Sequence, residues 1–135
     1  MSGFRQIDHT ADLALQLWAP SEAELLRVGA RAIVSTLTGG AEVRADATRS
    51  VSVDALDGED RLVQWLNEII YAAVTTGFVT ASADIELGAT SLTATLHGEA
   101  DASAKIETEL KSVTYHELKL EHTGDGWCAQ IVIDV

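Results

Sequence analysis

A strand that runs directly into a helix decides the fold, and it lies in residues 12–25, which read DLALQLWAPSEAEL. Leucine alternates with smaller or polar residues over positions 13–17, which is the period of a strand with one buried face. An S-x-x-E capping box then occupies residues 21–24 and opens a helix. The sequence therefore predicts a strand over residues 12–18, followed at once by a helix that ends at Gly39.

The rest of the chain repeats these two patterns. A second helix is expected from Asp57 to Gly77, because apolar residues recur there at spacings of three and four. Residues 102–110 fit either a short helix or an irregular loop. Strand patterns occur at residues 51–55, 79–87, 91–97, 113–120 and 127–135. Helices between non-adjacent strands, together with terminal hairpins, predict an α+β fold: one domain over residues 1–135, in which two helices pack on one face of a mixed sheet.

Composition limits the possible functions. The net charge of −12 repels phosphate backbones, so we expect no direct binding to nucleic acid, although the charge also fits a role in solubility alone. No apolar run approaches the ~18 residues of a membrane span, and residues 1–6 lack the core of a signal peptide. The single cysteine, Cys128, favours a reducing compartment. We therefore expect a cytoplasmic protein that does not bind membranes.

The first candidate site is the run DHTAD at residues 8–12, which places two carboxylates and an imidazole in one short turn. Such groups suit a divalent cation or a phosphate. A second carboxylate, Asp134, stands in an otherwise apolar strand end, where a charge is costly unless it is paired, exposed or metal-bound. Strand phase points both Asp12 and Asp134 away from the helix-covered core. If their strands are neighbours, the two carboxylates can converge on one cation.

The second candidate is the block KSVTYH at residues 111–116, which offers an ammonium group, hydroxyls and an imidazole. Lys111 beside two aspartates could hold a phosphate. The simpler interpretation is an ordinary strand in which Lys111 and His116 are solvated and Tyr115 is half-packed.

Four blocks of the chain together resemble the archease family, and they keep the order and approximate spacing of that family. They read DHTADL (8–13), LVQWLNEIIY (62–71), KSVTYH (111–116) and WCAQIVIDV (127–135). The resemblance implies a small α+β protein that is not itself an enzyme. The resemblance further implies that this protein activates an RtcB-type RNA ligase, which joins 3′-phosphate and 5′-hydroxyl RNA ends in tRNA splicing and RNA repair. In that family the activator promotes GTP-dependent guanylylation of the ligase and multiple turnover, and it meets GTP and RNA only through the ligase.

The resemblance also assigns functional residues. The essential positions of the family fall on Asp12, Lys111 and Asp134. Asp12 and Asp134 would hold a divalent metal (Mg²⁺, Mn²⁺ or Ca²⁺), and Lys111 would meet a phosphate or a ligase carboxylate. Possible further metal ligands are Asp8, His9 and the main chain of Val135.

The chain departs from the family pattern at two places. Ser112 stands where the family more often has alanine, which is an exchange of one small residue for another. Residues 100–109 lack the histidine often found before the lysine block, and Lys105 lies in that region. If that histidine contacts the ligase, this chain does so differently.

Two other classes of function stay open. A stand-alone metal-dependent phosphatase or nuclease would use Asp8, Asp12 and Asp134 as ligands and His9 or His116 as base. A general chaperone or adaptor would leave the same acids merely solvated. Titration of metal into the wild type and Asp134→Asn separates these two.

Overall fold

Two helices form the middle layer of the molecule, and the computed structural model describes residues 1–7 and 12–135. Helix α1 (Glu22–Thr38) begins at Ser21, whose hydroxyl accepts the Glu24 N–H at 3.2 Å, and ends at Gly39 with a left-handed φ of 66°. Helix α2 (Gly58–Thr76) begins at Asp57, whose carboxylate accepts the Asp60 N–H at 2.8 Å, and ends at Gly77. The caps predicted from the sequence therefore mark both helices.

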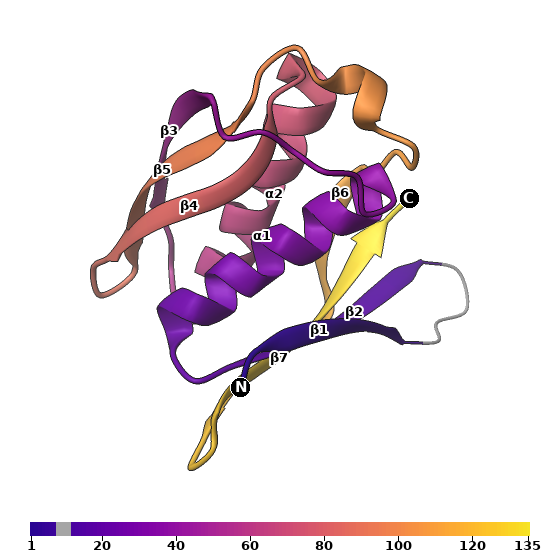
Figure 1. Cartoon of the computed structure of the whole chain (residues 1–135). Coiled ribbons are helices and arrows are strands. Elements are labelled where there is room, and N and C mark those ends of the chain that lie inside the picture. Colours follow the sequence, from indigo (N-terminus) through magenta and orange to yellow (C-terminus); the bar gives the residue numbers. More distant parts are fainter. Residues whose placement is uncertain (8–11) are drawn as a thin grey trace.

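The strands form two antiparallel sheets, one on each side of the helices (Figure 1). The four-stranded sheet has the order β1-β2-β7-β6, and the three-stranded sheet has the order β3-β5-β4. The strands are β1 (Gly3–Ile7), β2 (Leu13–Ala19), β3 (Ala47–Asp54), β4 (Val79–Leu87), β5 (Ser91–Glu99), β6 (Ser112–Thr123) and β7 (Gly126–Asp134).

The α+β class and the two helices are confirmed, whereas a single mixed sheet with both helices on one face is a wrong detail of the prediction. The physical reason is the width of the apolar surface on each helix. In α1, neighbouring residues such as Leu25, Leu26 and Val28 are all buried, so the helix needs apolar cover on more than one side. Strand β1 was not predicted, because Gly3–Ile7 lacks a clear alternation.

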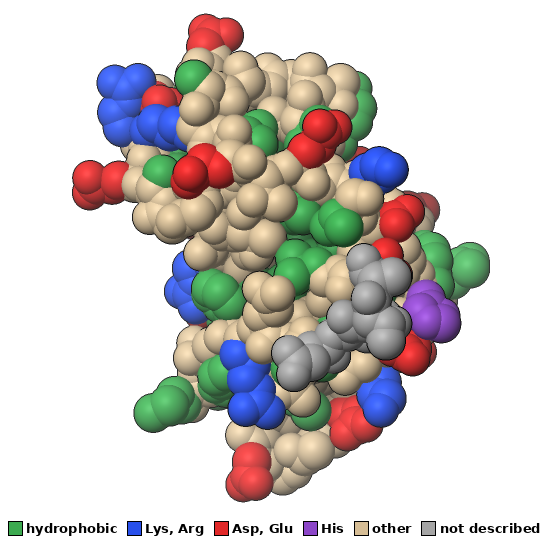
Figure 2. Space-filling view, turned by 90° about the vertical axis from the view of Figure 1, so that its right-hand side faces the viewer, with side chains coloured by type: hydrophobic (Ala, Val, Ile, Leu, Met, Phe, Trp, Pro, Cys, Tyr) green, Lys and Arg blue, Asp and Glu red, His purple; other side chains and the backbone are tan. Residues whose placement is uncertain are grey.

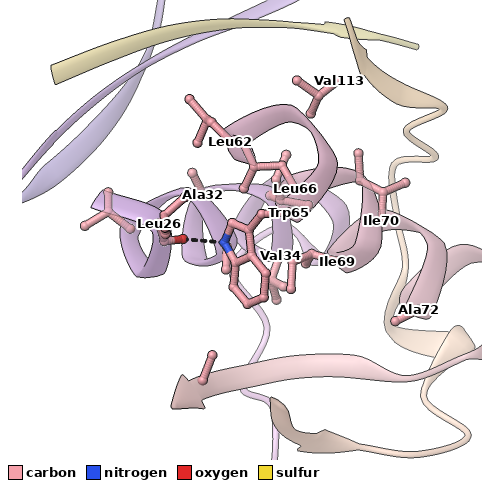
Figure 3. Packing of buried hydrophobic residues seen from close by; sticks show 14 of the residues in the cluster. Leu26, Ala32, Val34, Leu62, Trp65, Leu66, Ile69, Ile70, Ala72 and Val113 are labelled. Carbon is pink, nitrogen blue, oxygen red and sulfur yellow. Dashed lines mark hydrogen bonds between the residues drawn. The ribbon is translucent and has the colours of Figure 1, made fainter. Parts of the chain in front are cut away.

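One buried cluster joins both sheets to the helices, and Trp65 lies at its centre (Figure 3). The indole is fully buried, and its Nε1–H donates to the main-chain oxygen of Leu26 at 2.8 Å. This bond crosses from α2 to α1, so it fixes the two helices against each other and gives the buried indole N–H a partner. Neither helix of the described residues is long and apolar enough to cross a membrane.

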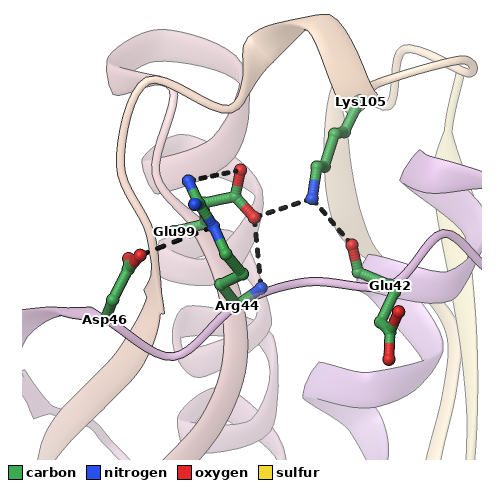
Figure 4. Close-up of polar contacts among 5 residues, drawn as sticks. All are labelled: Glu42, Arg44, Asp46, Glu99 and Lys105. Atoms are coloured by element: carbon green, nitrogen blue, oxygen red, sulfur yellow. Dashed lines mark hydrogen bonds and ion pairs between the residues drawn. The ribbon is translucent and has the colours of Figure 1, made fainter.

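A polar cluster closes the end of the three-stranded sheet (Figure 4). Glu99, at the end of β5, is 7% exposed and accepts a hydrogen bond from Lys105 Nζ at 2.7 Å. Its carboxylate also accepts the main-chain N–H of Arg44 at 3.1 Å. Lys105 ends the short 3₁₀ helix η1 (Ser103–Lys105), which answers the ambiguity at residues 102–110. The Lys105 bond first, and then the Arg44 N–H, lower the pKa of Glu99 to about 2.

Candidate functional site at the end of the four-stranded sheet

Strands β2 and β7 are antiparallel neighbours. This is the arrangement that Asp12 and Asp134 need if they are to bind one cation. Their register pairs Leu13 with Ile133 and Ala14 with Val132. Continued by one residue, this register sets Asp12 opposite Asp134. Leu15 and Ile133 belong to the core cluster beneath the sheet, so alternation puts both aspartates on the outer face, away from the helices.

Strand β6 brings Lys111 to the same end of the sheet. Ser112 pairs with Asp134, and the main-chain N–H of Lys111 donates to the main-chain oxygen of Asp134 at 2.9 Å. Lys111 and Asp134 are exposed, and Asp12 is half-buried. The main chains of three neighbouring strands therefore bring Asp12, Asp134 and Lys111 to one end of the sheet; we call this group the tip.

The tip supplies two carboxylates rather than a complete metal cage. Among residues 1–7 and 12–135, no three His, Cys, Asp or Glu side chains form a group that could hold a metal ion. Within the same ranges, no ion pair joins Lys111 to Asp12 or Asp134. The predicted supporting ligands Asp8 and His9 lie outside the described residues. A cation at the tip would therefore complete its coordination from other oxygen atoms.

The tip opens onto a cleft of about 640 Å³ beside the C-terminal end of α1. The residues that line it include Asp12, Val135, Arg5, Ser35 and Thr108. Asp12 and Val135 thus border a space large enough for a polar group of a partner molecule. On the face shown in Figure 2, acidic side chains are spread from end to end, with basic side chains among them.

The KSVTYH block forms a strand that leaves the ladder partway. Thr114 pairs with Val132, but the next pairing joins Lys119 to Gln130, so β6 advances five residues while β7 advances two. We call residues 115–118 the β6 bulge. Within it Glu117 has a left-handed φ of 53°, although it is not glycine. No turn residue marks this bulge, so sequence reasoning did not find it.

The bulge is tied to α2 through Tyr115, whose side chain is otherwise exposed. Its phenol donates to Asp60 Oδ1 at 2.5 Å. This bond lowers the pKa of Asp60 and raises the pKa of Tyr115, because it is made best when the carboxylate is charged and the phenol is neutral. The contact between Asp60 and β6 was not predicted from the sequence.

His116, the base of the stand-alone enzyme hypothesis, is exposed on the same bulge. Its Nε2 lies 3.8 Å from Glu117 Oε1. In the described part of the chain, no hydrogen bond or ion pair links His116 to Asp12 or Asp134. Among the described residues, strand pairing therefore brings Asp12, Asp134 and Lys111 to one end of the sheet and leaves His116 apart from them, while His9, the other candidate base, lies outside the described residues.

Comparison with known proteins places this architecture in a class of small α+β proteins. The solution structure of Methanobacterium thermoautotrophicum protein 1598 has the same fold, with a TM-score of 0.76, at 22% identity over 98% of this chain and 99% of that one. Residues 4–135 match the model of the archease protein family. The chain therefore belongs to the archease family.

Relatives of similar length support this assignment. Protein archease of Methanosarcina barkeri is 32% identical over 139 residues, which covers 98% of this chain and 95% of that protein. Protein archease of Archaeoglobus fulgidus is 27% identical, covering 98% of each chain. The name of these relatives attributes no enzymatic activity to them.

Proposed function

We propose that this chain is a cytoplasmic activator of an RtcB-type RNA ligase in tRNA splicing and RNA repair. In this role it promotes the GTP-dependent guanylylation of the ligase and its multiple turnover, and the covalent chemistry stays with the ligase. The observation that supports the proposal is the meeting of Asp12, Asp134 and Lys111 at one end of the four-stranded sheet. Membership of the archease family supports it independently.

The two carboxylates fit a hard divalent cation, Mg²⁺, Mn²⁺ or Ca²⁺. Such ions prefer carboxylate and carbonyl oxygens, and Mg²⁺ in particular is often held by one or two carboxylates together with water and substrate phosphates. Asp12 and Asp134 would hold the ion, the main chain of Val135 would add an oxygen, and Asp8 or His9 would support them. A bound cation would offset negative charge on the GTP phosphates in the ligase pocket.

Lys111 would contact a phosphate or a carboxylate of the ligase. Its ammonium group is a compact point charge on a flexible stem, which suits either anion. Without a cation, it would also reduce the repulsion between two carboxylates at neighbouring strand ends.

The net charge of −12 suits a partner that itself binds anions. A pocket that holds GTP and two RNA ends needs positive charge, and an acidic protein approaches such a pocket faster than a neutral one. The same charge argues that RNA contacts are made by the ligase.

The decisive experiment measures GMP loading of an RtcB-type ligase with and without this protein. We expect Asp12→Ala, Lys111→Ala and Asp134→Ala each to reduce the stimulation at least about tenfold. Asp125→Ala, at an exposed acid in the β6–β7 turn, is the matched control and should stimulate like the wild type. If all three tip variants stimulate fully, the assignment is wrong.

A metal titration addresses the tip without the ligase. Calorimetry with Mn²⁺ should give site-specific binding to the wild type and much weaker binding to Asp134→Asn. Equal binding would support the adaptor hypothesis, in which the acids are merely solvated. Phosphoester hydrolysis by the isolated protein with metal would instead support a stand-alone enzyme.

A further inference from the structure

One side chain of α2 occupies the free edge of β6. β6 is the last strand in the order β1-β2-β7-β6, so within residues 1–7 and 12–135 one of its edges has no neighbouring strand. There, Asn67 Oδ1 accepts the main-chain N–H of Val113 at 2.7 Å, and Asn67 Nδ2 donates to the main-chain oxygen of Val113 at 3.2 Å. A single amide therefore makes both bonds that an adjacent strand would otherwise make.

This contact lies within two residues of the tip. Val113 is 3% exposed and pairs with Ile133, and the preceding residue, Ser112, pairs with Asp134. At this partly buried edge, the two main-chain groups of Val113 would lose these partners without Asn67, and the loss is costly where water cannot replace them. The amide thus holds the first residues of β6 in the position from which Lys111 bonds to the Asp134 main chain.

The start of β6 depends on few other restraints. Only the pairs from Ser112 to Thr114 join it to β7 before the β6 bulge interrupts the ladder. Further ties are the Thr114 hydroxyl, which donates to the main-chain oxygen of Val132 at 3.3 Å, and the buried side chain of Leu110, whereas the Tyr115–Asp60 bond holds the bulge. Asp12 and Asp134, by contrast, each lie one residue beyond the uninterrupted β2–β7 ladder, whose last pair is Leu13 with Ile133. Lys111 is therefore the member of the tip whose position depends most on α2.

We propose that Asn67 is a positioning residue: its paired hydrogen bonds to Val113 fix the start of β6 and so set Lys111 beside Asp134. The effect on activity rests on the proposed function, whereas the effect on the position of β6 does not. The proposal predicts that loss of the Asn67 amide impairs the anion contact made by Lys111 and leaves cation binding by Asp12 and Asp134 unchanged.

The activity test is a double-mutant cycle on ligase guanylylation. We expect Asn67→Ala to reduce stimulation about tenfold, because misplacement of a functional group is costly. In the Lys111→Ala background, the same change should cause no further loss, and the Mn²⁺ affinity of Asn67→Ala should equal that of the wild type. An additive loss, or a parallel loss of Mn²⁺ affinity, would show general damage and overturn the proposal.

Gln64→Ala is the matched control, because Gln64 also places an amide on α2 but bonds to Asp60 at 2.8 Å and not to β6. It should keep wild-type stimulation. A loss equal to that of Asn67→Ala would mean that any amide lost from this helix has the same effect, and it would contradict the specific role of Asn67.

A second readout needs no ligase. Hydrogen exchange measured by NMR should be at least about tenfold faster at the Val113 and Lys111 amides of Asn67→Ala, and unchanged at Leu15 and Ile131 in the β2–β7 ladder. Unchanged exchange at Val113 and Lys111 would overturn the proposal. If the wild type fails to stimulate the ligase, the proposed function is wrong, and the exchange result still decides whether Asn67 positions β6.

Discussion

The two sheets that enclose the helices differ in where they are irregular. In the three-stranded sheet, β3 pairs with β5 without interruption from Ala47 to Asp54, and β4 has a single register shift between Thr80 and Ser82. The four-stranded sheet contains the longer β6 bulge and carries the tip at one end. The comparison teaches that both sheets pack on the helix layer, and that the longer interruption of regular pairing lies in the sheet that carries the tip.

The largest expected effect comes from the layer that both sheets share. Trp65→Ala should lower the free energy of unfolding by about 3–5 kcal/mol, because it leaves a cavity and removes the bond to the Leu26 carbonyl. Urea unfolding followed by circular dichroism measures it, and Trp65→Phe should cost less. A loss below about 1 kcal/mol would show that the sheets do not depend on this shared layer.

The next largest effect is expected in the three-stranded sheet and not in the four-stranded sheet. Arg61 is 3% exposed; its guanidinium donates to the main-chain oxygens of Gly88 and Ser91 in the β4–β5 turn and pairs with Glu22 at 2.9 Å. Arg61→Leu should cost about 3 kcal/mol, because these acceptors lose their partner. Hydrogen exchange should then accelerate at the β4–β5 turn and stay unchanged in β2 and β7. Equal acceleration in both sheets would contradict their separate roles.

A smaller effect appears only in acid. The pKa of Glu99 is about 2 in the folded protein, below its ordinary value of 4.5, so an unfolded chain binds the proton first as the pH falls. The contribution of Glu99 to stability is therefore complete above pH 4.5 and is lost as the pH approaches 2. Urea midpoints measured across this range should fall less steeply for Glu99→Gln than for the wild type. If the urea midpoints of Glu99→Gln and the wild type fall equally steeply with pH, Glu99 does not contribute to the loss of stability in acid.

The smallest effect on stability is expected at the tip. Asp134 and Lys111 are exposed, so Asp134→Asn and Lys111→Ala should each change the free energy of unfolding by less than about 0.5 kcal/mol in the absence of divalent cations. Thermal and urea unfolding in the presence of a metal chelator measure this change in free energy. A loss above about 1 kcal/mol would mean that the tip supports the fold, and the contrast between the sheets would weaken.

Local signals predicted much of this structure. Ser21 and Asp57 begin the helices and Gly39 and Gly77 end them, because caps act on groups within one turn. Strand phase also predicted that Asp12 and Asp134 lie on one face, and the pairing of β2 with β7 is the neighbour relation which that prediction needs. Each of these inferences needed only the spacing of apolar residues along the chain and the chemistry of residues close in sequence.

The division into two sheets was beyond such signals. Pairings such as Leu13 with Ile133 join residues far apart in the sequence, and alternation does not specify the partner of a strand. The role of Asn67 was missed for a related reason: a polar residue at the margin of a helical apolar stripe has the same pattern whether it faces water or the edge of a strand. The β6 bulge contains no glycine or proline that would have indicated it.

The β6 bulge also makes the length of the β6–β7 hairpin independent of the pairing at the start of β6. In an uninterrupted hairpin, a change in one would shift the other. In a regular antiparallel pair, one residue added to one strand shifts every later pairing and moves side chains to the opposite face. Here the spare residues between Thr114 and Lys119 can absorb such a change. The hairpin from Lys119 to Gln130 can therefore vary in length while the Lys111 main chain stays bonded to Asp134. We expect related sequences to differ in length in this hairpin and to keep the length of residues 111–114.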